Sequence, residues 1–501
     1  MSGGFRSHSR RAQAHSRQHY DGSSLDNSSH GDKRETHAHR RRGKVQQDAA
    51  REAALAVVRG VRADGAFANI LLSQELRTRR LNKQDAAFAT ELANGTVRAQ
   101  GVLDPIIEAA AHRKASDIDG DLLDVLRLGT YQLLRTKVPP HAAVSTSTEL
   151  VRGERGQGAA GFVNAVLRAV SRKSLNEWMT DCAPQDDYPL GALAFRTSHP
   201  RWIAEAFAAA LAAEHRDTEL EAALQADDER PVVHLVALPG MVSAEEVAAI
   251  TGGEQGHLSD YSVHLSGGGN PGKLDVVREG LARVQDEGSQ VVARTLVRAG
   301  KTRAQEGEVW LDLCAGPGGK AALLGAEAAA VGARVIAVEP VPHRAKLVRQ
   351  ATAGLPVEIL EADGATITAS ELGYPHGFDR ILVDAPCSGL GSLRRRPESR
   401  WRRQPSDLAD LTELQMELLQ NALKLVKKDG YVAYSTCSPH VLETRAIVRK
   451  VAEQTGARIL DATQYIDDSS DIYSAPYIQL WPHRHGTDAM FVSLLQRPEE
   501  N

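Results

Sequence analysis

Apolar residues recur every three or four positions along residues 46–173. The spacing is clearest in residues 53–58 and 122–128, and the apolar segment 161–168 closes the block. Because residues three and four apart lie on the same face of a helix, this pattern predicts consecutive amphipathic α-helices. We therefore expect an all-helical domain over residues 46–173.

Residues 174–289 have a mixed pattern. Several prolines precede an alanine-rich segment at 202–213, which fits a helix. A continuous apolar run at 232–238 is typical of a buried strand, and residues 244–250 fit another helix. We expect a linker helix followed by a small α/β module.

The pattern changes again at about residue 290, where short apolar runs alternate with helical segments such as 320–330 and 343–352. This alternation predicts a mostly parallel, doubly wound α/β sheet of the Rossmann-like class over residues 290–501. The expected strands are 309–313, 335–339, 357–360, 380–384 and 431–435. Two final apolar runs, 477–481 and 490–495, predict a terminal antiparallel pair.

The length of 501 residues fits about three domains of roughly 150 residues each. The net charge of −4 says little about partners. No apolar run reaches the ~18 residues that a membrane span needs, and no signal peptide is evident. The four cysteines are far apart and form no CxxC pair, which argues against a disulfide framework or a zinc site. We expect a cytoplasmic protein with free thiols and neither a metal nor a membrane partner.

The first 45 residues carry ten Lys and Arg against four Asp and Glu, and they are rich in Ser, Gly and His. The segment lacks an apolar period, so it is expected to be a disordered basic tail. Two interpretations remain open: a solubilising tail, or a basic arm that adds salt-dependent attraction to phosphates.

A glycine-rich turn, DLCAGPGGK, spans residues 312–320. It is not a P-loop, because Ala321 follows the lysine where Ser or Thr is needed, and it lacks the G-x-G-x-x-G spacing. Its glycines let the backbone turn tightly and approach a ligand. Lys320 could meet a carboxylate at the helix start, where the helix dipole also favours anions.

Ligands of such sheets bind outside the carboxyl ends of the strands. Four acidic residues fall near those ends: Asp312, Glu339, Asp363 and Asp384. Glu339 lies 23 residues past Gly316, close to the ~20 expected for an acid that accepts ribose hydroxyls. Asp363 would face the adenine side. This arrangement favours S-adenosylmethionine over the alternative that the turn only lets a helix and a strand pack closely.

Two cysteines follow neighbouring expected strands: Cys387 in DAPCSG and Cys437 in YSTCS. A thiolate that adds to C6 of cytosine makes C5 nucleophilic enough to take a methyl group, which is covalent catalysis. The alternative is that both are small buried apolar residues, but two cysteines at strand ends beside a cofactor-type turn favour catalysis. Asp384 could bond the exocyclic amine and N3 of the base, or it could cap a helix.

Residues 393–403 are dense in arginine and include Trp401. Guanidinium groups bind phosphates, and the indole could stack on a base. We expect contact with RNA, with a plain solvated loop as the alternative.

Residues 48–497 resemble the Sun/Fmu-type (RsmB-like) bacterial ribosomal RNA cytosine-C5 methyltransferases. The most specific matches are DLCAGPGGK, VDAPCSGLG, YSTCS and the end motif at residues 481–491. The helical block resembles the NusB antitermination domain that precedes the catalytic part in that family. The resemblance implies a class I S-adenosylmethionine-dependent methyltransferase fold, and it does not cover the basic tail.

The resemblance also implies residue roles. Cys437 would be the nucleophile and Cys387 would help to release the product adduct, whereas the DNA enzymes use the Pro-Cys thiol as nucleophile. The implied cofactor contacts are Cys314, Ala315, Gly316, Pro317, Gly318, Gly319, Lys320, Glu339, Asp363 and Asp384. Many relatives have Asp where this chain has Glu339, whose longer side chain should still reach the ribose.

The sequence thus predicts a monomeric enzyme that methylates C5 of a cytosine in RNA, with 16S ribosomal RNA as the expected substrate. Two alternatives stay open. One is a transfer RNA methyltransferase of the same chemistry, and the other is a non-catalytic, NusB-like RNA-binding or antitermination factor.

Overall fold

The structure is a computed structural model that describes residues 48–184, 189–267, 269–300, 304–466, 472 and 474–497. The predicted basic tail, residues 1–45, lies outside these residues.

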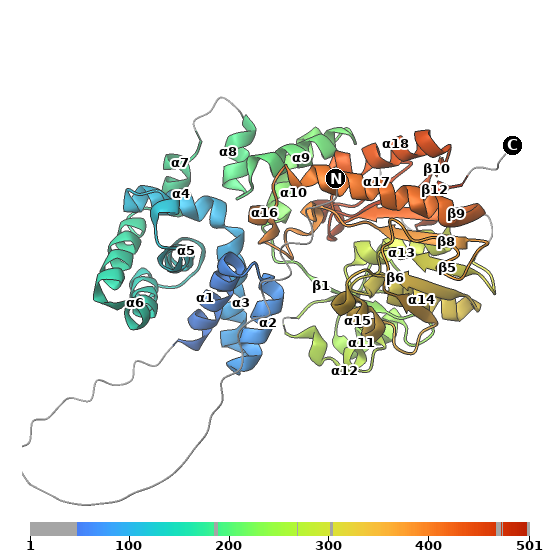
Figure 1. The fold of residues 1–501 in the computed structure, drawn as a ribbon. Coiled ribbons are helices and arrows are strands. Elements are labelled where there is room, and N and C mark those ends of the chain that lie inside the picture. Colours follow the sequence, from blue (N-terminus) through green and yellow to red (C-terminus); the bar gives the residue numbers. More distant parts are fainter. Residues whose placement is uncertain are drawn as a thin grey trace, which may run out of the picture. The chain divides into compact units, whose positions relative to one another are not determined.

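Six α-helices build the first domain and confirm the all-helical prediction (Figure 1). They are α1 (Ala49–Ala63), α2 (Ala68–Thr78), α3 (Lys83–Arg98), α4 (Gln100–Ala111), α5 (Gly120–Arg135) and α6 (Pro140–Val170). Helix α5 lies among the others, and its residues 123–132 are all buried. The side chains of Asp48, Asn82 and Asp119 accept backbone N–H groups at the starts of α1, α3 and α5, which fixes where these helices begin.

Four short helices follow: α7 (Leu175–Asp181), α8 (Pro189–Arg196), α9 (Arg201–Ala212) and α10 (Leu220–Ala226). Next comes an antiparallel sheet in the order β2–β3–β1–β4. Its strands are β1 (Val233–Ala237), β2 (Glu254–Gln255), β3 (Ser262–Leu265) and β4 (Ala282–Val284), with α11 (Ala244–Thr251) and α12 (Asp275–Arg278) between them. Sequence analysis predicted β1 and α11 but missed β2, β3 and β4, because two to four residues are too few to show a period.

The large sheet has the order β10–β12–β9–β8–β5–β6–β7, and β11 pairs with β12. Its strands are β5 (Val309–Asp312), β6 (Arg334–Val338), β7 (Val357–Leu360), β8 (Phe378–Asp384), β9 (Val426–Thr436), β10 (Arg458–Leu460), β11 (Ile478–Gln479) and β12 (Phe491–Gln496). Strands β5 to β9 pair in parallel, as predicted. Strand β12 runs antiparallel to β9 and β11, which confirms the terminal antiparallel pair.

Helices cover both faces of this sheet, α17 (Asp407–Leu425) and α18 (Arg445–Thr455) on one side, α13 (Glu287–Arg298) and α14 (Gly319–Val331) on the other (Figure 1). Successive strand residues point to opposite faces. In β8, Ile381 and Val383 pack under α17 and α18, while Leu382 packs under α13 and α14. Both faces of the central strands are therefore buried, which explains their continuous apolar runs.

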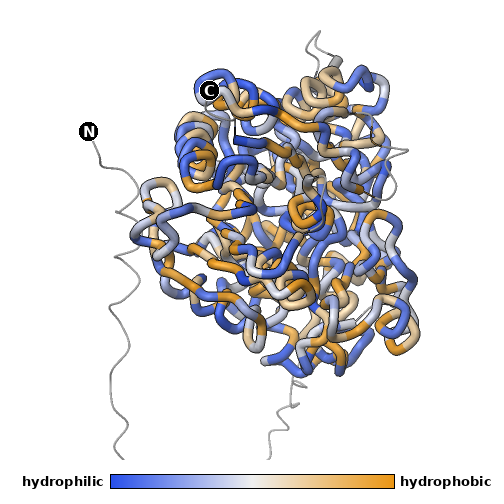
Figure 2. Tube along the Cα trace, turned by 90° about the vertical axis from the view of Figure 1, so that its right-hand side faces the viewer, coloured by the Kyte–Doolittle hydropathy of each residue, from blue (hydrophilic) through white to orange (hydrophobic). Residues whose placement is uncertain are grey.

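Hydrophobic stretches recur along the whole described trace and alternate with hydrophilic ones (Figure 2). This distribution is expected where each helix buries one face. Among the described residues, no helix has the length and apolar character that a membrane crossing requires.

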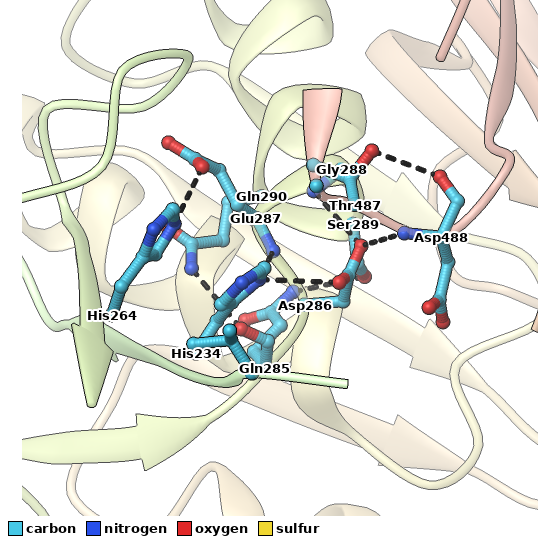
Figure 3. Close-up of polar contacts among 12 residues, drawn as sticks. His234, His264, Gln285, Asp286, Glu287, Gly288, Ser289, Gln290, Thr487 and Asp488 are labelled. Carbon is cyan, nitrogen blue, oxygen red and sulfur yellow. Dashed lines mark hydrogen bonds and ion pairs between the residues drawn. The ribbon is translucent and has the colours of Figure 1, made fainter. Parts of the chain in front are cut away.

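A buried polar cluster joins the small sheet to the large one at the start of α13 (Figure 3). Oδ1 of Asp286 lies 3.2 Å from Nδ1 of His234 of β1, and its Oδ2 accepts from the backbone N–H of Asp488 at 3.1 Å. Glu287 bonds the ring of His264 of β3 at 2.8 Å. The helix crosses the predicted domain boundary at residue 290, so the catalytic half and the small module share this element.

Candidate active site

The two predicted cysteines meet at the carboxyl edge of the large sheet. Cys387 follows β8 and Cys437 follows β9, and these strands are parallel neighbours. The Sγ atoms of the two residues lie 3.4 Å apart. Two thiols separated by 50 positions in the chain therefore form one pair.

The surroundings distinguish the two thiols. The hydrogen bond between them lowers the pKa of Cys437 and raises that of Cys387. Burial opposes the lowering at Cys437, whereas the cations of Arg396 and Lys320 add to it. The pair therefore favours a thiolate at Cys437 that accepts a hydrogen bond from a protonated Cys387.

A carboxylate that sequence analysis missed holds both cysteine turns together. Glu443 is fully buried, and it accepts from the backbone N–H of Ser388 at 2.7 Å and from the hydroxyl of Ser438 at 2.6 Å. The hydroxyl of Ser388 also donates to it, and the Gln415 amide donates at 3.2 Å. Ser388 and Ser438 each follow a cysteine directly, so one side chain fixes the spacing of the two turns. The only signal in the sequence was the position of Glu443 six residues past Cys437.

The glycine-rich turn connects β5 to α14 and has little room for side chains. Gly318 adopts the left-handed conformation at φ 106°, and a Cβ there would come within 2.9 Å of Val348 Cα. A Cβ on Gly316 would overlap the carboxylate of Glu339. The turn thus needs glycine at both positions because neighbouring residues pack directly against its backbone, and not only because glycine is flexible.

Glu339 lies directly against this turn. Its Oε2 accepts from the N–H of Gly316 at 3.1 Å, and its Oε1 accepts from the N–H of Val341 at 3.0 Å. Arg344 of α15 (Pro342–Ala351), which sequence analysis did not single out, donates to the carbonyl of Gly316 at 2.7 Å. The predicted ribose acceptor and the predicted turn are therefore one structural unit.

Lys320 and Asp384 form an ion pair between this turn and the cysteines. The Nζ of Lys320 lies 2.9 Å from Oδ2 of Asp384, whose Oδ1 accepts from Ser435 Oγ at 3.0 Å. Burial alone would lower the pKa of Lys320, but Asp384 raises it above its ordinary value. Asp384 ends β8 and caps no helix, so that alternative is wrong.

Asp312 adds a second carboxylate at the end of β5. Burial raises its pKa to about 7, and the nearby charge of Asp384 adds to the rise. Its Oδ2 is buried without a hydrogen-bond partner. Asp363, by contrast, is exposed just past β7, and its carboxylate accepts from the N–H of Ala365 in its own turn at 3.0 Å. Cys314 packs against the apolar core under α17.

Much of the arginine-rich run contacts other segments of the fold. Arg395 pairs with Asp286 at 2.7 Å and with Asp488 at 2.8 Å, and Arg400 is fully buried against Asp228 at 3.0 Å. The indole N–H of Trp401 donates to the carbonyl of Val97 in the helical domain at 2.7 Å. The alternative of a plain solvated loop is therefore wrong for Arg395, Arg400 and Trp401, whereas the contact of the run with RNA stays a prediction. Acids far away in the sequence pair with Arg394, Arg395 and Arg400, which thereby join separate segments of the fold.

Comparisons with known proteins agree with this architecture. The family model described as 16S rRNA methyltransferase RsmB/F matches residues 301–496, and the NusB family model matches residues 48–172. Rv1407 of Mycobacterium tuberculosis, whose name assigns it to the methyltransferases, is 51% identical over 90% of this chain and 97% of its own length. The ribosomal RNA small subunit methyltransferase B of Shewanella oneidensis is 30% identical over 82% of this chain and 91% of its own.

Among solved structures, that of PH0851 matches with a TM-score of 0.74 at 20% identity and covers 90% of this chain and 99% of its own. This likeness shows the fold. The chain therefore belongs to the RsmB/F family of 16S rRNA methyltransferases and carries a NusB-like domain before a Rossmann-like catalytic domain. It is an RNA methyltransferase, and its family uses S-adenosylmethionine.

Proposed function

We propose that this protein methylates C5 of a cytosine in 16S ribosomal RNA through a covalent adduct with Cys437. The observation that carries the proposal is the unequal thiol pair, 3.4 Å apart, beside a glycine-rich turn at the carboxyl edge of the sheet. One thiol has a lowered pKa, as a nucleophile needs. The alternative of a non-catalytic RNA-binding factor leaves this pair without a purpose.

The turn fits S-adenosylmethionine. Glu339 stands where an acid can accept ribose hydroxyls, and the glycine-rich backbone leaves space for close approach of a ligand. Asp312, at the end of β5 directly before this turn, has a buried carboxylate oxygen without a hydrogen-bond partner. When bound, S-adenosylmethionine supplies the methyl group.

The residues of the pair would divide the chemistry. The Cys437 thiolate bonds C6 of the flipped cytosine, and the electron pair released into the ring makes C5 the nucleophile. After methylation, a base takes the C5 proton and the C6–S bond breaks. Cys387 can donate a hydrogen bond to the departing thiolate, which supports a role in release. Asp384 has lone pairs left to accept from a protonated N3 and from the exocyclic amine of the base, beside the charge of Lys320.

The experiment uses the full-length protein with methyl-labelled S-adenosylmethionine and total RNA, followed by bisulfite mapping of 5-methylcytosine. We expect one modified cytosine in 16S RNA and none with Cys437→Ala. Label confined to transfer RNA would keep the chemistry and overturn the substrate. If neither free RNA nor immature small subunits were labelled, the binding-factor alternative would replace the proposal.

A further inference from the structure

The loop between α1 and α2 lies on the catalytic half of the chain. Arg402, which belongs to α16 (Ser399–Arg402), donates to the carbonyl of Val61 at 3.1 Å and to that of Ala66. The indole of its neighbour Trp401 is bonded to Val97, as described above. These bonds fix one loop of the NusB-like domain next to the segment that follows Cys387.

Phe67, the last residue of that loop, presents its ring to solvent. It is 47% exposed, and within the described part of the chain it is the single aromatic residue among the exposed large apolar side chains. The guanidinium carbons of Arg396 and Arg402 both lie 5.8 Å from its ring centroid. Arginines at this distance attract the ring and restrict its orientation, which leaves an ordered aromatic surface facing water.

Arg396 links this ring to the active site. It is exposed, and no hydrogen bond or ion pair to its guanidinium occurs within the described ranges. It differs in this from Arg394, Arg395 and Arg400 of the same run, which acids neutralise. Its charge is close enough to Cys437 to lower the pKa of that thiol. One exposed cation, which has no hydrogen bond or ion pair to its guanidinium in the described part of the chain, therefore lies near both the nucleophile and the exposed ring.

We propose that Phe67 and Arg396 bind a nucleotide that flanks the target cytosine, the base stacking on the Phe67 ring and Arg396 meeting a phosphate. The inference rests on the proposed function, because it takes RNA as the substrate of the cysteine pair. An exposed aromatic ring beside an exposed guanidinium matches the two parts of an unpaired nucleotide, a planar base and an anionic phosphate. The NusB-like domain thereby contributes a residue to the substrate site itself.

The test compares Phe67→Leu with Phe67→Trp in the full-length protein. Leucine keeps an apolar side chain under the two arginines but cannot stack, whereas tryptophan can. The probe is a 16S RNA fragment that contains the cytosine methylated by the wild type, or total 16S RNA if no methylation is seen. We measure its Kd, and its KM and kcat where turnover exists. Ile250→Ala, at a 62% exposed apolar residue of α11, is the matched control.

We expect Phe67→Leu to raise the Kd and KM for RNA roughly 5- to 100-fold, the range that base stacking supplies, with kcat and S-adenosylmethionine affinity unchanged. Phe67→Trp and Ile250→Ala should behave like the wild type. If Phe67→Leu does not fold, Arg396→Gln serves instead, and it should weaken binding and reduce the salt dependence by about one phosphate contact.

Wild-type affinity in Phe67→Leu, or an equal loss in Phe67→Trp, would overturn the stacking role. Unchanged affinity and salt dependence in Arg396→Gln would overturn the phosphate contact. Neither result would touch the proposed function, which fails separately if the wild type transfers no methyl group to RNA.

Discussion

Cys387 and Cys437 lie with their sulfur atoms 3.4 Å apart, and the pKa of one is raised while that of the other is lowered. Either cysteine could be the nucleophile on sequence grounds alone, because both follow a strand at the same edge. The hydrogen bond with Cys387 lowers the pKa of Cys437, and the cations of Arg396 and Lys320 add to the lowering, so the thiolate is favoured at Cys437.

This asymmetry predicts the pH dependence of alkylation. Iodoacetamide reacts with a thiolate, so modification of Cys437 should rise with pH around a midpoint below that of an ordinary thiol, about 8.5. Cys387→Ala removes the main cause of the lowered pKa and should move the midpoint to higher pH. Peptide mass spectrometry across pH 6–10 measures the midpoint of Cys437 alkylation. Cys182 is an internal control, because burial raises its pKa. Equal midpoints in wild type and variant would refute the role of Cys387.

Glu443 should prove essential to the geometry of the pair. Glu443→Ala leaves four donor groups without their acceptor. Each unsatisfied buried group costs about 1–3 kcal/mol, but some of the four will bond water instead. We therefore expect the variant to lose about 2–4 kcal/mol of stability. Methyl transfer per folded molecule should also fall at least tenfold. Thermal denaturation and single-turnover assays check this, with Glu417→Ala on the exposed side of α17 as the control. Normal turnover in the folded fraction would show that Glu443 does not position the two thiols.

Gly316→Ala should disrupt the cofactor turn. The added methyl group overlaps the Glu339 carboxylate and approaches the Arg344 guanidinium within 2.8 Å, so Glu339 must move. We expect S-adenosylmethionine affinity to fall more than tenfold in calorimetry, with the NusB-like domain unaffected. Gly161→Ala in α6, where a Cβ meets nothing within 4 Å, should bind normally. Unchanged affinity in Gly316→Ala would argue that the cofactor lies elsewhere.

The arginine-rich run should separate into structural and RNA-binding members. Arg395→Ala removes the nearer of two guanidinium groups from Asp286 and Asp488 and leaves them with Arg394, at 3.8 and 3.3 Å. This loss should cost about 2–4 kcal/mol in denaturant unfolding. Arg396→Ala should leave stability unchanged within about 0.5 kcal/mol, as expected for a surface substitution, and weaken RNA binding instead. The same loss of stability in both variants would contradict this division.

Periodicity and motif spacing predicted the parallel strands, the helical domain and the meeting of the two cysteines, because each depends on local pattern or on strand ends sharing one edge. Glu443 could not be recognised, since its importance comes from four donors contributed by three separate segments. The internal pairing of the arginine run could not be recognised for the same reason. Its neutralising acids, Asp228, Asp286 and Asp488, lie far from it in the sequence and only the fold brings them close.

The central claim is that Cys437 attacks the cytosine, and the covalent adduct tests it most directly. Cys387→Ala protein is incubated with 16S RNA and S-adenosylmethionine, digested with protease and nuclease, and the cross-linked peptide is sequenced by mass spectrometry. The account predicts a methylated cytidine attached to the peptide that contains Cys437. A nucleotide attached to any other residue, or methylated RNA without an adduct in this variant, would contradict it.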